Sequence, residues 1–450
     1  MTSRPPKIDR RTLARRLAAV LLAGPPTAEE RAARLDEYLD GRMSRLQAAM
    51  LEALDTTFAR PYPPGEKALA RAIVHNPAIG PMVSALNRRN VSLAAVLDPP
   101  AFAPAPAFAG AAVPVLATPG DLATWLGLST DELTWFADTQ DRLAAPAYSG
   151  RRHYRTRWIA KRAGGVRLLE APLPRLKTLQ RQILHGILDH VLPHPAAHGF
   201  TAGRNCTQAA ARHAGEDVVL TADLEDFFHS VHAKRIHAIF RSLGYPAPVA
   251  RHLTGLVTVR TPAEVVGAES LPWIARRRLD HAHLPQGAPT SPALANLAAF
   301  HLDRRLSALM ARRGGRYTRY ADDLAFSGDR SLFVEGGVPF LEILTEITAE
   351  EGFRLNAAKT RLMRRGTRQR VTGLVVNERV NVPRADYDRL KAILTNCARH
   401  GPHSQNRDGH PAFRAHLLGR IAWVAATNPT RGRKLYALFD RIDWSRGATE

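Results

Sequence analysis

The chain has 450 residues, of which 45% are hydrophobic, so it is long enough to bury more than one core. Its formal net charge is +22 at pH 7, from 63 Lys and Arg against 41 Asp and Glu. A charge of this sign and size excludes an acidic scaffold and favours a polyanionic partner, with nucleic acid as the first candidate. A proteome rich in Arg is the alternative explanation.

Cysteine usage and hydropathy indicate the compartment in which the protein is found. Cys206 and Cys397 are isolated, which indicates neither a disulfide framework nor a zinc site and is typical of a reducing, cytoplasmic compartment. The sequence lacks an apolar run long enough to cross a bilayer, so we expect no membrane span. Residues 10–22 resemble a short targeting peptide, but polar helical sequence follows directly and an amphipathic first helix is the preferred interpretation.

The first third of the chain is predicted to be helical. Residues 1–97 form a helical N-terminal extension, because apolar residues recur at helical spacing: Leu35, Leu39, Met43, Leu46, Met50 and Leu54. Residues 98–120 are rich in Pro and Ala, which disfavours helix and sheet, so we expect a linker. Residues 121–148 are predicted to be a short helical segment, with Asp121 or Ser129 as the candidate N-cap.

From residue 149 the pattern changes to strands that alternate with helices. Residues 161–168 predict a hairpin, in which a pair of glycines turns the chain between Lys161 and Arg167. These two cations are candidates to hold a triphosphate, and a plain basic surface is the alternative. Residues 176–191 predict a helix.

Two further stretches place polar groups next to buried structure. Residues 217–223 are an apolar run of strand length that ends on Asp223, a pattern that delivers a carboxylate to the edge of a sheet. Residues 284–292 predict an irregular loop, after which Ser291 and Pro292 start a long helix. Such a loop and helix start can face a phosphate or a base pair, with Gln286 directed into the same cleft.

Residues 319–326 place two adjacent carboxylates, Asp322 and Asp323, between short runs typical of strands. The pattern predicts a hairpin with acids at its tip. Neighbouring aspartates repel each other, so a rigid turn that carries both is explained best by a bound cation. A solvated turn is the alternative, because Asp is common in turns.

The last part of the chain is predicted to be helical and basic. A helix over residues 340–351 and a hairpin strand over residues 370–377 come first. Helices over residues 387–399 and 413–426 follow, with many interspersed cations that include Arg399, Arg431 and Arg433. Such a basic helical bundle is suited to gripping a nucleic-acid duplex.

Four stretches of the chain, taken in order, resemble the motifs of the reverse transcriptases. They are Asp223 with Phe227 and Phe228, residues 285–292, residues 320–323, and residues 352–360. The resemblance covers about residues 150–385. It implies an α+β right-hand polymerase, with fingers and palm that contain an antiparallel sheet over residues 149–385 and a helical thumb over residues 386–450.

Within that superfamily the bacterial retron branch is the nearest likeness. His198-Gly199-Phe200, Gly203-Arg204 and His213 resemble the family's extra segment before the first motif, and Val371-Thr372-Gly373 resembles its characteristic triplet. One departure is that Ala209 stands where the family has Asn.

The resemblance implies roles for individual residues. Asp223, Asp322 and Asp323 are the catalytic acids and hold two Mg²⁺ ions, with the Leu224 carbonyl as a further ligand. The implied nucleotide-binding residues are Lys161, Arg167, Phe228, Gln286 and Lys359, where Phe228 blocks a ribose 2′-hydroxyl and Lys359 is a candidate proton donor. The predicted nucleic-acid contacts are Arg204, Arg399, Arg431 and Arg433.

The function that the resemblance implies is RNA-directed DNA synthesis by a retron, in anti-phage defence. Its partners are a cognate non-coding RNA that serves as template and primer, the branched cDNA product, dNTPs and an effector protein encoded nearby. Two alternatives remain open. One is another bacterial reverse transcriptase, of a group II intron or unclassified defence type, and the other is a catalytically silent RNA-binding scaffold. The intact acids oppose the scaffold.

Overall fold

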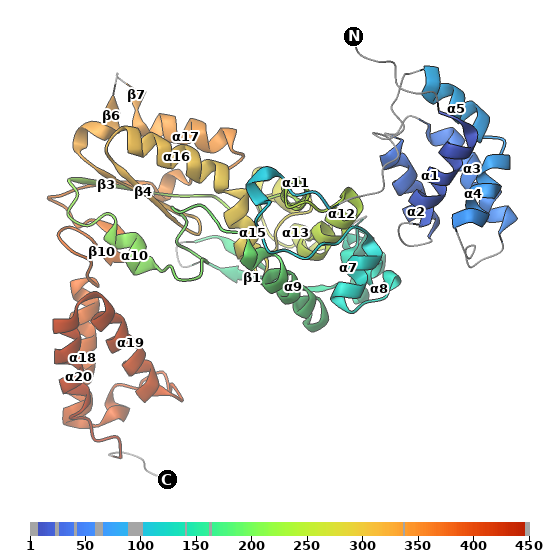
Figure 1. Cartoon of the computed structure of the whole chain (residues 1–450). Coiled ribbons are helices and arrows are strands. Elements are labelled where there is room, and N and C mark those ends of the chain that lie inside the picture. Colours follow the sequence, from blue (N-terminus) through green and yellow to red (C-terminus); the bar gives the residue numbers. More distant parts are fainter. Residues whose placement is uncertain are drawn as a thin grey trace. The chain divides into compact units, whose positions relative to one another are not determined.

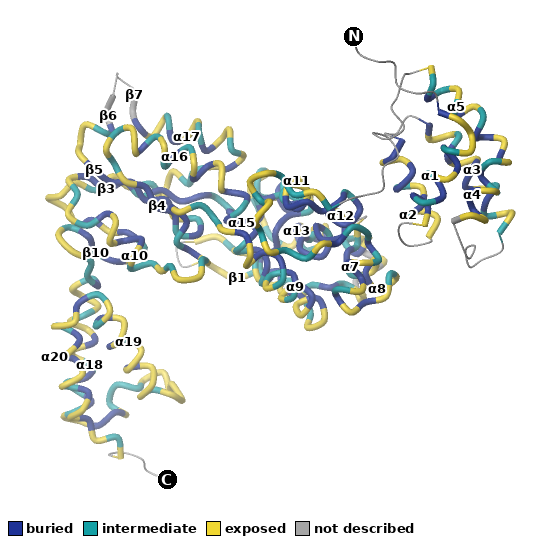
Figure 2. The backbone as a smooth tube through the Cα atoms, viewed as in Figure 1, coloured by how far each residue is buried: buried dark blue, intermediate teal, exposed yellow. Residues whose placement is uncertain are grey.

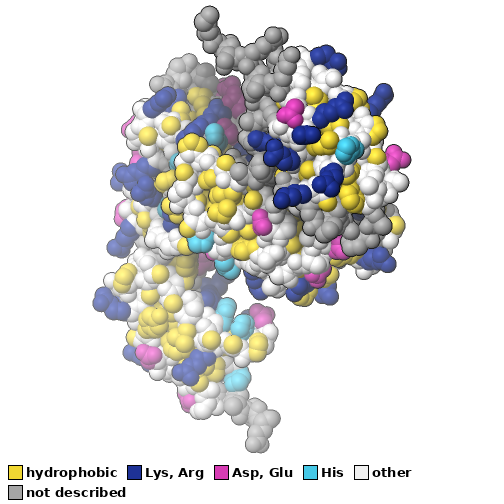
Figure 3. Space-filling model, turned by 45° about the vertical axis from the view of Figure 1, so that its right-hand side comes forward, with side chains coloured by type: hydrophobic (Ala, Val, Ile, Leu, Met, Phe, Trp, Pro, Cys, Tyr) yellow, Lys and Arg dark blue, Asp and Glu magenta, His cyan; other side chains and the backbone are white. Residues whose placement is uncertain are grey.

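The computed structural model describes residues 8–22, 27–39, 43–58, 66–88, 102–139, 142–161, 164–335 and 338–445. The chain divides into two compact units, and each is described by itself. Unit 1 comprises residues 1–191 and 231–291, and unit 2 comprises residues 192–230 and 292–450. Helices and antiparallel strands are mixed along the chain, so the fold class is α+β, as the sequence predicts (Figure 1). Lys and Arg side chains are spread over the face shown in Figure 3.

Unit 1 begins with a bundle of amphipathic helices. Its helices are α1 (Arg10–Leu22), α2 (Ala28–Tyr38), α3 (Ser44–Thr57), α4 (Glu66–His75) and α5 (Ile79–Arg88). The apolar residues predicted from their spacing form its core, with Leu35 and Leu54 almost inaccessible to solvent. The guanidinium of Arg34 is buried and donates to the carbonyls of Val20 and Leu21, which satisfies the end of α1. The expected amphipathic first helix is therefore confirmed.

The rest of unit 1 combines one hairpin with short helices. The elements are α7 (Pro119–Leu126), α8 (Thr130–Ala137), β1 (Tyr154–Ala160), β2 (Val166–Pro172), α9 (Pro174–Gly186), α11 (Ala233–Ser242), α12 (Ala247–Val257), α13 (Ala263–Gly267) and α14 (Trp273–Leu279), with single 3₁₀ turns at Pro106–Phe108, Arg142–Ala144, Pro146–Arg151 and Leu188–His190. Strands β1 and β2 pair antiparallel, from Tyr154 opposite Pro172 to Ala160 opposite Val166.

Unit 2 is built on a four-stranded antiparallel sheet in the order β4-β5-β3-β8. Its strands are β3 (Val218–Asp223), β4 (Arg316–Tyr320), β5 (Asp323–Gly328) and β8 (Arg361–Arg364). Figure 2 shows that the central strands are buried. Helices α16 (Phe300–Arg312) and α17 (Phe340–Glu350) lie on one side of this sheet, and α10 (Cys206–Ala211) lies on the other (Figure 1).

The remaining elements of unit 2 continue the same core. They are α15 (Ser291–Ala298), β6 (Val334–Glu335), β7 (Val338–Pro339), β9 (Arg370–Val371), β10 (Leu374–Val375), α18 (Arg384–His400), α19 (Phe413–Thr427) and α20 (Pro429–Phe439), with 3₁₀ turns at Arg330–Phe333, Ala357–Lys359 and Pro402–Ser404. One apolar cluster joins Val219 and Ala325 of the sheet to Leu390, Ile421 and Leu435 of the last three helices. The predicted basic helical end of the chain therefore joins the core of the sheet through the β9–β10 residues Val371 and Leu374.

Several predicted boundaries are wrong, and capping chemistry explains the first of them. Helix α7 begins at Pro119 because Thr118 is its N-cap, and Asp121 completes the capping box from inside the helix. Ser129 caps α8, as predicted. Helix α9 ends at Gly186, earlier than the predicted residue 191. The helix predicted after Pro292 is two helices, since α15 and α16 are separated at Ala299.

Some predicted features lie outside the described residues. The start of the linker, residues 98–101, and the hairpin residues 162 and 163 belong to this group. The described part of the linker contains one 3₁₀ turn before α7, and the Ala103 and Ala105 amides donate to the Gly244 and Ser242 carbonyls. This segment therefore adheres to unit 1. Among the described helices, none combines the length and apolar character needed to cross a bilayer.

Candidate active site

The three predicted acids meet at one edge of the unit 2 sheet. Asp223 ends β3 and is paired with Asp323, the first residue of β5. Tyr320 closes the β4–β5 hairpin opposite Asp323, so Ala321 and Asp322 form its two-residue turn. Carboxylate oxygens of Asp223, Asp322 and Asp323 lie within 4.8 Å of one another. The hairpin with acids at its tip is thus present, and Asp223 completes the cluster from about a hundred residues earlier.

A hollow of about 260 Å³ opens beside these acids. Asp223, Asp323 and Lys359 line it together with Tyr320, and the Thr372–Gly373 turn closes another part of its wall. The Lys359 ammonium lies 2.8 Å from Oδ2 of Asp223, so the predicted proton donor is in direct contact with one of the predicted catalytic acids. The neighbourhood of the acids is therefore polar and partly basic.

Crowding of like charges affects the protonation of this cluster. The pKa of Asp323 is raised to about 6, first because the surrounding protein restricts its hydration and then because Asp322 and Asp223 repel its charge. Lys359 opposes this shift. Desolvation lowers the pKa of Lys359, but attraction to Asp223 and the two neighbouring acids outweighs it, so the net pKa is raised. The cluster therefore attracts positive charge.

A buried cation supports the turn from the other side of the strand. Arg319 is fully buried, and its guanidinium forms a bidentate pair with Asp303 of α16 at 2.6 and 2.8 Å. Its Nη1 also donates to the Asn296 side chain and to the Ala321 carbonyl, which lies 3.0 Å away. Ala321 has a φ of 57°, which is uncommon for a residue with a side chain. The network holds this turn in a costly conformation.

The His198–Phe200 segment packs on the same strand. The His198 amide donates to the Arg319 carbonyl, and the Arg319 amide donates to Ala196. Position 199 has no room for a side chain, because a Cβ there would collide with the backbone nitrogen of Ala321. This explains the glycine physically, by close approach of two backbones. The segment therefore packs against the turn that carries Asp322 and supports its position.

His213 also supports the sheet from within unit 2. The sequence indicated this residue only through the resemblance to the family. Its two ring nitrogens contact the hydroxyl groups of Ser327 on β5 and Thr318 on β4, at 2.7 and 2.8 Å. Burial lowers the pKa of His213 to about 3, so the ring is neutral and bridges the two strands. Ala209, which stands in place of the family's Asn, is completely buried in α10.

The predicted phosphate-binding cations lie on the β1–β2 hairpin of unit 1. Lys161 and Arg167 are both exposed. Ile159 pairs with Arg167, and the Lys161 amide donates to Gly165 across the turn, so the register places both cations on one face. This confirms the hairpin, while the contact with a triphosphate stays a prediction.

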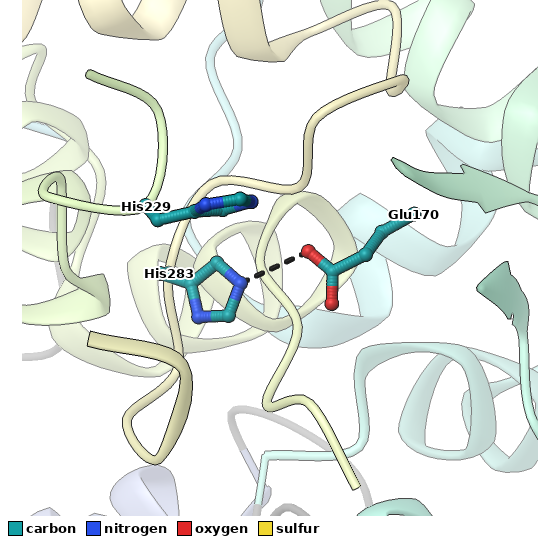
Figure 4. A group of neighbouring side chains, drawn as sticks. All are labelled: Glu170, His229 and His283. Atoms are coloured by element: carbon teal, nitrogen blue, oxygen red, sulfur yellow. Dashed lines mark hydrogen bonds and ion pairs between the residues drawn. The ribbon is translucent and has the colours of Figure 1, made fainter. Parts of the chain in front are cut away.

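The loop that carries Gln286 is anchored within unit 1 by buried polar groups. The Glu170 amide donates to the Gln286 carbonyl, and Gly287, with a φ of 136°, passes close to the Glu170 carbonyl. The Glu170 carboxylate accepts from Thr261 at 2.7 Å and lies 3.0 Å from Nε2 of His283 (Figure 4). Because Glu170 is fully buried, these contacts are needed to satisfy its charge.

Phe228 and Leu224 follow Asp223 in the chain and lie in unit 2. The half-buried Phe228 ring is part of an aromatic group with Phe200 and Phe227, at centroid distances of 6.2 and 5.7 Å. Phe227 is buried and packs on Phe353 and on the Arg319 guanidinium. The Leu224 amide donates to the Asp322 carbonyl at 2.9 Å, which ties the first acid's strand to the turn.

The four predicted nucleic-acid contacts differ in their surroundings. Nη1 of Arg204 donates to the carbonyls of His194, Pro195 and Ala197, so part of this side chain is used by the fold. Arg431 lies 4.9 Å above the Tyr387 ring. Arg399 and Arg433 are exposed on α18 and α20. Of the four, Arg433 can therefore reach a phosphate group most easily, and Arg204 is the most restricted by its contacts within the fold.

The donor set at the sheet edge fits a hard divalent cation. Three carboxylates converge there, and oxygen ligands without sulfur or imidazole are what Mg²⁺ and Mn²⁺ prefer. The raised pKa of Asp323 supports the same conclusion, because a bound cation would relieve the repulsion that causes it. Asp223, Asp322 and Asp323 would hold such an ion.

Sequence reasoning missed the supporting residues Arg319, Asp303, Asn296, Glu170 and Thr261. Arg319 stands directly before the hairpin tip, and a charged residue at an inward strand position could have been noticed. Asp303 and Asn296 lie in helical sequence that gives no signal of their partner.

Comparison with known proteins agrees with this geometry. Residues 159–387 match the family model described as reverse transcriptase (RNA-dependent DNA polymerase). The Retron Mx65 reverse transcriptase of Myxococcus xanthus is 41% identical over 336 residues, which cover 72% of this chain and 71% of that protein. The Retron Mx162 reverse transcriptase of the same organism is 37% identical, covering 73% of this chain and 67% of that protein.

A more distant relative shows the same assignment. The Retron Ec86 reverse transcriptase of Escherichia coli is 33% identical over 63% of this chain and 78% of its own length. Reverse transcriptases use divalent metal ions, which suits the carboxylate cluster. The chain therefore belongs to the bacterial retron reverse transcriptases, and it is an RNA-directed DNA polymerase.

Proposed function

We propose that this enzyme copies a cognate structured non-coding RNA into branched, RNA-linked single-stranded DNA, in the cytoplasm and in anti-phage defence with an effector encoded nearby. The observation that carries the catalytic part is the convergence of Asp223, Asp322 and Asp323 at one sheet edge. The right-hand division into fingers and palm over residues 149–385 and thumb over 386–450, after a helical extension, a linker and a short helical segment, is part of the proposal.

Two Mg²⁺ ions bound at these acids would activate the primer hydroxyl and stabilise the pyrophosphate leaving group. Asp223 and Asp322 would hold the ions, with Asp323 as the third acid and the Leu224 carbonyl as a further ligand. Support comes from the Arg319 network, which fixes the turn that presents Asp322. The Lys359 ammonium pairs with Oδ2 of Asp223, which would bring it within reach of the reacting phosphates.

The incoming dNTP is bound by residues from several elements in this proposal. Lys161 and Arg167 contact the triphosphate, which is supported by their exposure on one face of the hairpin. Gln286 positions the nucleotide, and its loop is anchored by Glu170. Phe228 blocks the ribose 2′-hydroxyl. Arg204, Arg399, Arg431 and Arg433 contact the template and primer.

The deciding experiment is to express the gene with its flanking DNA and to sequence the nucleic acid that copurifies with the protein. A branched RNA–DNA molecule is expected. A linear cDNA would favour another type of bacterial reverse transcriptase, and RNA without DNA would favour the silent scaffold.

The matched control is Asp322→Asn, which removes one charge without changing the shape of the turn. We expect it to lower dNTP incorporation by on the order of a thousandfold, since it removes a metal ligand, while RNA still copurifies. Near-normal incorporation by this variant would contradict the assignment of the acids.

A further inference from the structure

Helix α14 of unit 1 carries an aromatic side chain that packing does not explain. Trp273, at the start of this helix, is 69% exposed, the largest value among the described aromatic residues. An exposed indole leaves a large apolar surface in water. The ring therefore contributes little to the core of unit 1 and is available to a ligand.

The exposure of Trp273 does not come from a loosely attached helix. Leu279, at the other end of α14, is 3% exposed and packs with Val266 of α13 and Leu168 of β2. The Trp158 indole of β1 donates to the Val265 carbonyl at 3.2 Å. Helix α14 is thus anchored to the same hairpin that carries Lys161 and Arg167.

One cation lies over the exposed ring, and others lie close to that cation. The Arg277 guanidinium lies 5.0 Å from the centre of the Trp273 ring, a cation–π arrangement, and Arg276 is exposed beside it. A hollow of about 560 Å³ adjoins Arg277 and is lined also by Arg260, His281 and Ala282, with Asp280 as its acidic member. The surface therefore combines one flat apolar face with several positive groups.

We propose that this surface, formed by Trp273, Arg260, Arg276 and Arg277 and called here the Trp273 platform, binds an unpaired nucleotide. The base stacks on the indole, and the arginines bind the flanking phosphates. Aromatic stacking tolerates every base because each has a π-face, and an arginine fork matches phosphate geometry. The inference rests on the proposed function, because the ligand is a single-stranded part of the RNA or of its DNA product.

An apolar protein segment fits this surface less well. It would cover the indole but would leave the adjacent guanidinium groups without partners, and removing such charges from water is costly. A polynucleotide satisfies the ring and the charges together. If the surface bound a protein and not a nucleotide, replacing Trp273 would not change how well the enzyme distinguishes an RNA from the same RNA without a base. Binding measurements with the two RNAs therefore separate the two possibilities.

The test uses the full-length protein and a single-stranded RNA of about the site size of one stacking module. Its affinity is measured by fluorescence anisotropy beside that of an abasic RNA of equal length and a DNA of the same sequence. We expect Trp273→Ala to weaken RNA binding about tenfold, with no change for the abasic strand. Trp273→Phe should recover most of the affinity, since it keeps an aromatic face.

Charge is tested separately from stacking. Arg277→Gln together with Arg260→Gln should weaken binding of both RNA and abasic RNA and flatten the dependence of affinity on salt. The DNA arm identifies the source of the nucleotide: equal losses for RNA and DNA indicate that either strand occupies the platform, and a loss restricted to RNA indicates the template.

The matched control is Leu192→Ala, which truncates an apolar side chain that is 83% exposed. It should bind all three strands as the unchanged protein does. Equal affinities of Trp273→Ala and the unchanged protein for RNA, or equal losses on abasic RNA, would overturn the platform. Incorporation of dNTPs on a primed template is measured on the same preparations, so failure of the polymerase assignment is recognised independently of strand binding.

Discussion

The two charged hairpins of this protein differ in what surrounds their tips. The β4–β5 hairpin lies in a four-stranded sheet, its strands are buried, and Arg319, Asp303 and Asn296 support its turn from below. The β1–β2 hairpin is a two-stranded ribbon whose cations, Lys161 and Arg167, are exposed.

The difference follows from the charges that each hairpin presents. Clustered carboxylates repel one another, so their positions must be imposed by the surrounding fold. Single cations that bind phosphate need only reach and exposure, because their long side chains adapt to the ligand. The contrast predicts that substitutions at the β4–β5 hairpin lower both stability and catalysis. Substitutions at the β1–β2 hairpin should affect only substrate binding.

The largest effect is expected from Arg319→Met. It leaves the buried Asp303 carboxylate without its charged partner and with the Tyr317 hydroxyl as a remaining donor. The free energy of unfolding should therefore fall by about 3–5 kcal/mol, measured by urea titration. Incorporation of dNTPs should fall as well, because the Ala321 carbonyl loses a donor.

A double variant separates these two effects. Arg319→Met combined with Asp303→Leu removes the orphaned charge and should recover most of the stability. Incorporation should stay low, since the turn still lacks its donor. If both properties recover together, the Arg319 network acts on stability alone and not on the geometry of the turn.

At the exposed hairpin, Arg167→Ala and Lys161→Ala should each raise KM for dNTP by about tenfold, the loss of roughly one charge-assisted contact. The thermal midpoint should not change, because neither side chain is buried. Arg167→Lys keeps the charge but not the fork, and an intermediate KM is expected. A fall of the thermal midpoint in the alanine variants would contradict the contrast between the hairpins.

The pH dependence of stability tests crowding at the acidic tip. Because the folded pKa of Asp323 is raised to about 6 from the ordinary value of 3.8, its contribution to stability is present below the lower value. That contribution is lost as pH rises through the upper one. In the presence of a chelator, Asp323→Asn should therefore raise the thermal midpoint at pH 8 but not at pH 3.5.

A divalent cation should remove the advantage of Asp323→Asn. Added Mg²⁺ should stabilise the unchanged protein by pairing with the acids, and the variant should bind it less well. An equal midpoint shift by Mg²⁺ in both proteins would mean that Asp323 does not contribute to ion binding.

The smallest effect is expected at the C-terminal helices. Replacing Arg431 and Arg433 with Gln should reduce the slope of log affinity for a template–primer duplex against log salt concentration by about 0.9 for each lost phosphate contact. Arg71→Gln with Arg88→Gln, two exposed residues of the first bundle, is the control and should leave the slope unchanged. An unaltered slope in the variant of Arg431 and Arg433 would mean that other residues bind the duplex.

Local patterns predicted much of the fold because the information was local. The apolar run that ends on Asp223, the strands on both sides of Asp322 and the helical spacing of the first bundle each follow from a single period and its endpoint. Boundaries were less predictable. Asp121 is inside α7 because Thr118, three residues earlier, is the N-cap of that helix. Ala299 separates α15 from α16 although the apolar pattern of the sequence is continuous there.

By itself, the amino-acid sequence determined the chemical content of the site: three acids, a lysine, and motifs in the order of the family. Only the tertiary structure decided what holds these groups in place. The sequence pattern placed Arg319 on one face of a strand, and the structure shows that it is buried against Asp303. His213 bridges two strands that lie more than a hundred residues later in the chain. Contacts of this kind depend on which distant segments pack together, and no local period encodes that.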